Sequence, residues 1–116
     1  MSKDRWHILR EGPVLVLARH LPVRFDVSAT TDLPAAGRAR LAGQIRQDLW
    51  RALQAQRGFS PAVEVTAVAS GLRVRAGGRV AAGRFDRAGL EARIAAVLED
   101  PGNRVRWIRS AGGARP

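Results

Sequence analysis

The chain has 116 residues, the size of one ordinary domain, and it contains no cysteine, which excludes disulfides, thiolate metal sites and cysteine nucleophiles. Its 20 basic residues outnumber its 10 acidic residues, so the formal net charge of +10 favours a polyanionic partner. The longest apolar runs, residues 14–18 and 94–98, are far shorter than the roughly 20 residues of a membrane span. We therefore expect a cytoplasmic protein with no membrane partner.

The first segments with a strand pattern precede residue 30. Residues 6–10 and 14–19 are stretches of strand length separated by a Gly-Pro pair. Residues 23–29 alternate apolar with polar side chains, and this period of two predicts a strand with one buried face. An Asp-Leu-Pro sequence at residues 32–34 then predicts the start of the first helix, because proline's missing N–H costs nothing in a first turn.

The following segment has the periodicity of an amphipathic helix that faces a core, with Gly58 as a suitable stop. Arg40 and Arg51 fall on the face opposite the apolar stripe. Trp50 also lies outside the stripe, so it either flanks the core or is a candidate aromatic contact for a base or a protein partner. The apolar stripe consists of Leu41, Ile45, Leu49, Ala52 and Leu53.

Residues 63–76 carry the clearest strand pattern in the chain. Two alternating segments flank a Ser-Gly pair at residues 70–71, and a two-residue turn there predicts a hairpin that pairs residue 69 with residue 72. One face of this hairpin is then apolar, and the other face carries Arg73 and Arg75.

The last third of the chain contains one further turn signal, a helix and a possible strand. A Gly-Gly pair at residues 77–78 predicts a second turn, followed by a strand at residues 80–84. Asp86 is the predicted N-cap of a second helix that a Pro-Gly pair at residues 101–102 ends. Residues 104–109 alternate apolar side chains with arginine, which predicts a final strand.

These elements predict an α+β fold, with a two-layer, mostly antiparallel sheet that carries two amphipathic helices on one face. Two arrangements fit their order. One is the ferredoxin-like order βαββαβ, and the other is a duplicated βββα arrangement, because Arg-Phe-Asp occurs before each helix, at residues 24–26 and 84–86. We expect residues 1–110 to form a single domain and residues 111–116 to be a disordered tail.

The positive charge is concentrated in two segments. Residues 36–84 hold nine arginines against two acids, and residues 101–116 hold four arginines and no acid. Arginine suits phosphate because its planar fork donates paired hydrogen bonds and stays charged. The leading interpretation is a small, non-enzymatic protein that binds RNA or DNA through backbone phosphates. The candidate contacts are Arg40, Arg51, Arg73, Arg75, Arg104 and Arg106, with Trp50 and Trp107 as aromatic contacts.

Two other interpretations stay open. Arginine and tryptophan are also enriched in protein interfaces, so the chain is alternatively an assembly subunit that binds an acidic protein or a second copy of itself. The preference for arginine over lysine is in addition typical of a GC-rich bacterial genome, in which case the arginines form an ordinary solvated surface.

No arrangement of residues indicates catalysis, a metal or a cofactor, and we expect none of the three. The two histidines, His7 and His20, are thirteen residues apart, and neither has a His or Cys companion at the short spacings of metal sites. His20 and Asp26 approach each other if residues 14–19 and 23–29 form a hairpin.

Overall fold

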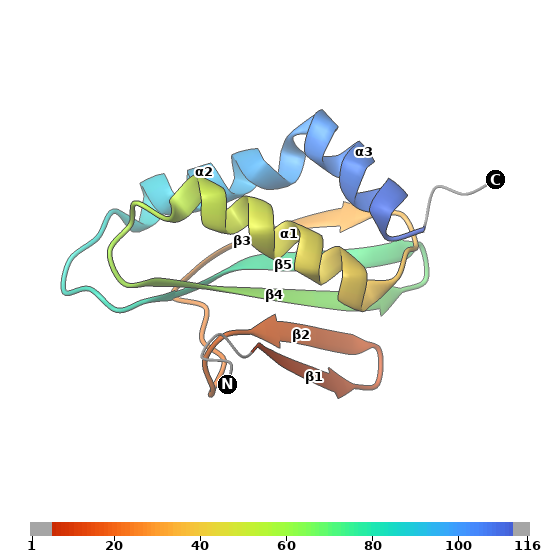
Figure 1. Ribbon diagram of the computed structural model, residues 1–116, viewed down its shortest axis with the longest axis horizontal. Coiled ribbons are helices and arrows are strands. Elements are labelled where there is room, and N and C mark those ends of the chain that lie inside the picture. The colour runs from red at the N-terminus through yellow and green to blue at the C-terminus, as the bar shows by residue number, and fades with distance from the viewer. Residues whose placement is uncertain (1–5, 113–116) are drawn as a thin grey trace.

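The computed structural model describes residues 6–112, in which five strands form one sheet and three helices lie together on one of its faces (Figure 1). The predicted α+β class is confirmed, and each pair of neighbouring strands is antiparallel. The helices number three where the sequence predicts two, and residues 113–116 of the predicted tail lie outside the described part. In chain order the elements are β1 (His7–Glu11), β2 (Val14–Ala18), β3 (Val27–Leu33), α1 (Arg38–Leu53), β4 (Phe59–Val68), β5 (Gly71–Val80), α2 (Arg87–Glu99) and α3 (Pro101–Ser110).

The strands lie in the order β1-β2-β4-β5-β3, so β2 and β3 are far apart in the sheet although they follow each other in the chain. Residues 19–26 leave β2, run past the start of β4 and the end of β5, and enter β3 at the far edge. Residues 6–112 therefore adopt neither the ferredoxin-like order nor the duplicated βββα arrangement. The connection brings residues 19–26 to the end of the sheet where β4 begins.

The core lies between the sheet and the helices. Alternate side chains of the central strands, such as Val65 and Val74, are fully buried against the stripe of α1, which includes Leu41 and Ile45. The predicted core face of α1 is thus confirmed. Burial of each such side chain contributes about 1.5–3 kcal/mol. α3 packs against α1 and α2 and adds the fully buried Trp107 to the same core.

β3 and α1 both begin later than the sequence predicts. β3 does not cover residues 23–29 but runs to Leu33, and α1 begins after Gly37 rather than at the Asp-Leu-Pro sequence. Side chains that face the helices alternate through Thr31 to Leu33, which is buried opposite Leu72. The two threonines and the aspartate of β3 obscure this alternation in the sequence. Pairing with β5 makes residues 30–33 part of the strand, because tertiary contacts override a weak local strand propensity.

β4 and β5 form the predicted hairpin in a register that differs from the predicted one by two residues. Val68 pairs with Gly71, so the turn consists of Ala69 and Ser70 rather than residues 70–71. A shift of two residues keeps every side chain on its predicted face, because side chains in a strand alternate with a period of two. Gly71 is the first residue of β5. Glycine is needed there because the φ of +143° disfavours other residues and a Cβ would collide with the carbonyl oxygen of Leu33.

The Gly77-Gly78 pair lies inside β5 and is not the predicted turn. The strand continues to Val80, and residues 81–86 form a loop instead of the predicted strand at residues 80–84. A Cβ on Gly77 would collide with the carbonyl oxygen of Val27, and a Cβ on Gly78 would collide with that of Ser60. The two glycines therefore allow β3 and β4 to approach β5 closely.

α2 begins as predicted, whereas the predicted final strand is a third helix. The side chain of Asp86 accepts a hydrogen bond from the N–H of Gly89 at 2.9 Å, which caps α2. Asp100 does the same for α3 through the N–H of Asn103 at 3.0 Å, and Pro101 takes the first helical position. The prediction failed because the Pro-Gly pair was interpreted as a stop, although an aspartate before a proline is also a helix start.

Candidate anion-binding pocket

Two of the six predicted phosphate contacts, Arg73 and Arg75, lie on the face of the sheet that the helices leave open. Nε of Arg73 donates to Oδ1 of Asp32 at 3.2 Å, and both side chains are exposed. Arg75 lies over the ring of Phe25, with Cζ 4.2 Å from the ring centroid, and Glu64 is its partner across the β4–β5 ladder. Each arginine therefore has an acidic neighbour, which offsets its charge.

The other four predicted contacts lie in the helical layer, where each contacts other groups of the fold. Arg51 and Arg106 share the carboxylate of Asp48, at 3.4 Å and 2.8 Å. Arg104 donates to the carbonyl oxygen of Leu98 and to Thr31, both at 2.9 Å. Arg40 donates to the carbonyl oxygen of Ser110 at 3.3 Å.

Asp48 is the centre of the junction between α1 and α3. It is a buried carboxylate, and its Oδ2 accepts hydrogen bonds from Nε1 of Trp107 at 2.6 Å and from Arg106. Trp107 is fully buried, so its ring is not exposed to a partner in the folded chain, whereas Trp50 is 42 % exposed. The predicted site residues thus lie in two separate layers. Their role in phosphate binding stays a prediction.

A different set of residues converges on a pocket of about 340 Å³ at the end of the sheet where β2 ends and β4 begins. Arg46 and Trp50 come from the same side of α1, because residues four apart are neighbours on a helix. The pairing of His7 with Ala18 brings Trp6 beside the residues that follow β2. The pocket is lined by Trp6, Arg19, His20, Arg46, Trp50, Phe59, Ser60 and Pro61.

The electrostatics of this pocket centre on Arg46. Its guanidinium carbon lies 4.6 Å from the ring centroid of Trp6, and that of Arg19 lies 5.8 Å from the same centroid. Burial and the charge of Arg19 lower the pKa of Arg46. Nε of Arg46 is buried and has no hydrogen-bond partner among residues 6–112. The described residues that line the pocket include no acid, so an anion in the pocket would offset the repulsion between Arg46 and Arg19.

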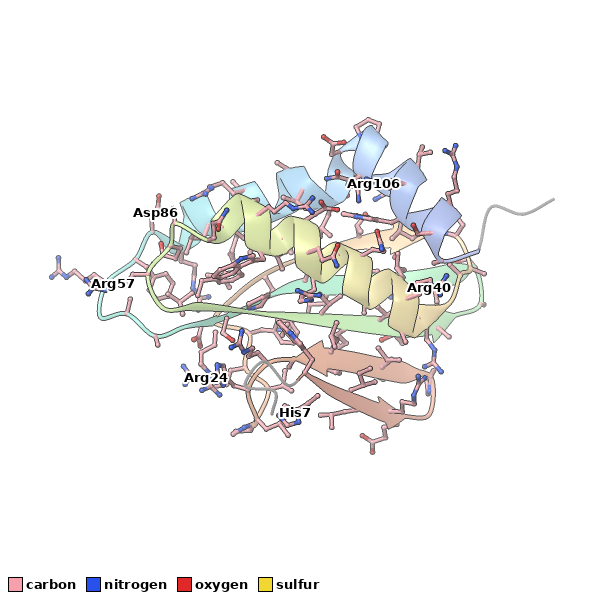
Figure 2. All side chains as sticks on the ribbon, in the orientation of Figure 1. His7, Arg24, Arg40, Arg57, Asp86 and Arg106 are labelled. Atoms are coloured by element: carbon pink, nitrogen blue, oxygen red, sulfur yellow. The ribbon has the colours of Figure 1, made fainter. Side chains whose placement is uncertain are left out.

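A smaller depression adjoins the pocket and adds two further arginines. It shares His20, Ser60 and Pro61 with the pocket and is also lined by Arg24 and Arg79. We name Arg19, His20, Arg24, Arg46 and Arg79 together the basic end. Figure 2 shows Arg24 and Arg40 at opposite ends of the molecule.

The carboxylate of Asp26 connects residues 19–26 to the end of β5. Its Oδ2 accepts the backbone N–H of Val80 at 2.8 Å, and a single Nη2 of Arg24 contacts both carboxylate oxygens, at 2.9 and 3.0 Å. The Val80 hydrogen bond lowers the pKa of Asp26, and Arg24 and Arg79 lower it further. Asp26 thereby holds the connection from β2 to β3 against the end of β5.

The sequence contained little that identifies this pocket. Arg46 and Trp50 are four residues apart, which makes them neighbours on a helix, and this spacing is the one usable signal. Trp6 begins a segment of strand length, where an aromatic residue indicates no particular site. The hairpin that would bring His20 to Asp26 does not form, because β4 and β5 separate β2 from β3.

Within residues 6–112, no three His, Cys, Asp or Glu side chains are grouped as a metal site would require, and no helix has the length and apolar character needed to cross a membrane. No family model, curated protein or solved structure matches this chain.

Proposed function

We propose that this protein is a non-enzymatic nucleic-acid-binding domain that holds backbone phosphates at its basic end. The observation that carries the proposal is the convergence of four arginines and a histidine on two adjoining pockets, of which the larger has no acid among its described lining residues. The net charge of +10 supplies long-range attraction for a polyanion.

The hydrogen bonding of the basic end supports the same assignment. The described lining of the pocket around Arg46 includes no carboxylate, and one amino group of Arg79 donates to the carbonyl oxygen of Pro22 at 2.9 Å. A phosphate offers several acceptor oxygens and a charge of the opposite sign, and it therefore suits the guanidinium groups of both side chains. Arg24 is different, because Asp26 already balances its charge.

The test is a titration of nuclease-treated protein with labelled mixed-sequence RNA and DNA at two salt concentrations. About three phosphate contacts predict that affinity falls roughly 20- to 40-fold between ~50 and ~200 mM salt. A flat salt dependence, or no binding at ~50 mM salt, would contradict the proposal.

Two variants with the same change in charge locate the contact. Arg79→Ala removes a cation from the basic end, whereas Arg40→Ala removes one from the opposite end of the molecule (Figure 2). We expect Arg79→Ala to reduce the slope of log affinity against log salt by about 0.7–0.9, and Arg40→Ala to leave it nearly unchanged. Equal effects of the two variants would mean that the attraction is spread over the whole surface.

A second candidate function, self-assembly or binding to an acidic protein, is favoured by the β1 edge of the sheet. Ile8 and Leu9 are 49 % and 44 % exposed there, and β1 has a paired neighbour on one side, β2. An edge strand with exposed apolar side chains is a template for pairing with another strand. Light scattering after gel filtration tests this candidate, since a mass of 12.6 kDa at every concentration would exclude self-assembly.

A further inference from the structure

The larger pocket of the basic end presents an aromatic surface as well as cations. Trp50 lies at its rim with 42 % of its surface exposed, and Phe59 forms part of the wall. The ring of Trp6 is already covered by Arg46, so Trp50 is the indole that is open to a ligand. A half-exposed tryptophan beside a partly buried arginine is a suitable surface for a flat ring that is attached to an anionic group.

The dimensions of the pocket limit what such a ligand can be. Its volume of about 340 Å³ is at the lower end of the range of small-molecule sites, roughly 300–1,000 Å³. One nucleotide fits this range better than a run of stacked bases does. Ser60 adds a hydroxyl group to the lining, and His20 adds an imidazole ring with hydrogen-bonding nitrogens.

We propose that this pocket takes one unpaired nucleotide, with its base on Trp50 and its phosphate on Arg46, so that the protein prefers single-stranded to duplex nucleic acid. The inference rests on the proposed function and adds the form of the nucleic acid that is recognised. A base within a duplex has both faces stacked and its edge paired, and it reaches such a pocket only after it is flipped out. An unpaired base enters without that cost, which is the source of the preference.

The arrangement also predicts little discrimination among bases. Stacking on an indole tolerates every base because each one has a π face. In this proposal the arginines of the pocket bind phosphate, and its described lining residues include one side-chain hydroxyl and no side-chain amide that could read a base edge. We therefore expect binding that depends on strandedness more than on sequence.

The experiment compares a labelled mixed-sequence DNA single strand with the duplex of the same sequence at ~50 mM salt. The first variant is Trp50→Leu, which removes the indole and keeps an apolar side chain. The control is Val105→Ala on α3, where an apolar side chain is 55 % exposed away from the basic end. Circular dichroism and thermal unfolding establish that both variants are folded.

We expect the native protein to bind the single strand at least tenfold more tightly than the duplex. Trp50→Leu should weaken single-strand binding about 5- to 150-fold and leave duplex binding unchanged. A nucleoside 5′-monophosphate should compete with the single strand better than inorganic phosphate does. Val105→Ala should change neither affinity.

Three results would overturn the inference. Equal affinity for the two forms with a steep salt dependence would leave the proposed function intact and remove the single-strand pocket. Equal weakening of both forms by Trp50→Leu would show that the indole has no stacking role. An absence of binding to either form at ~50 mM salt would overturn the inference together with the proposed function, leaving an acidic protein as the partner to pursue.

Discussion

Arg106 and Arg46 both lie on helices beside a tryptophan, but their surroundings differ. Arg106 and the indole N–H of Trp107 share the buried carboxylate of Asp48, at 2.8 and 2.6 Å. Arg46 lies over Trp6, and its Nε has no hydrogen-bond partner among the described residues. Arg106 is paired with a buried carboxylate and so helps to hold α1 and α3 together. The pocket around Arg46 has no acid among its described lining residues, so the charge of Arg46 remains available to a ligand.

The largest expected effect on stability comes from removing the carboxylate of Asp48, which Arg106 contacts and Arg46 does not. Asp48→Ala leaves the buried indole N–H of Trp107 without an acceptor and releases Arg106, so we expect the free energy of unfolding to fall by about 2–4 kcal/mol. Urea denaturation measures this. Asp48→Asn is the control, since it retains an acceptor oxygen and should cost less. A loss below about 1 kcal/mol in Asp48→Ala would contradict a structural role for this junction.

Arg46→Met tests whether Arg46 contributes to ligand binding rather than to the stability of the fold. The substitution should weaken nucleic-acid binding by at least about tenfold, because a charge-assisted hydrogen bond to phosphate is lost. The unmet donor of Arg46 is a cost to the fold, whereas its contact with the ring of Trp6 is a gain, and the substitution removes both. The free energy of unfolding should therefore change by less than about 1 kcal/mol. A clear loss of stability would place Arg46 with the structural arginines.

Arg106→Met should behave in the opposite way. It removes one of the cations that balance Asp48 and leaves the indole hydrogen bond in place, so we expect a loss of stability of about 1 kcal/mol. Nucleic-acid binding should change no more than for the distant Arg40→Ala variant. A strong effect of Arg106→Met on binding would move the phosphate contacts from the pocket to the helical layer.

The smallest effect is a pH dependence at the basic end, where Asp26 stabilises the connection into β3. Its pKa in the folded chain is below the value of 3.8 for a free side chain, so its contribution is fully present above pH ~4. That contribution is lost as the pH falls through the lower value of the folded state. Stability curves of the native protein and Asp26→Asn should therefore converge towards pH ~2. A gap that stays constant from pH ~5 to ~2 would contradict this sign.

The fold could be predicted in its local parts and the candidate site could not. The buried face of α1, the two faces of the hairpin and the cap of α2 follow from patterns within a few residues of the sequence. The prediction at Gly77 and Gly78 was wrong because a tight turn and a close approach of two backbones both favour a residue without a Cβ. The segment after Asp100 was misassigned because proline both ends and begins helices.

The sequence by itself determined the fold class, the core-facing residues of the longest elements and the surplus of positive charge. Those properties depend on composition and on the periodicity of neighbouring side chains. Tertiary structure alone decided which arginines meet a carboxylate, because Asp48 and Arg106 are 58 residues apart and a contact at that separation depends on how α1 and α3 pack. It also placed the crossing from β2 to β3 at the end of the sheet, and that crossing creates the pocket around Arg46 and Trp50.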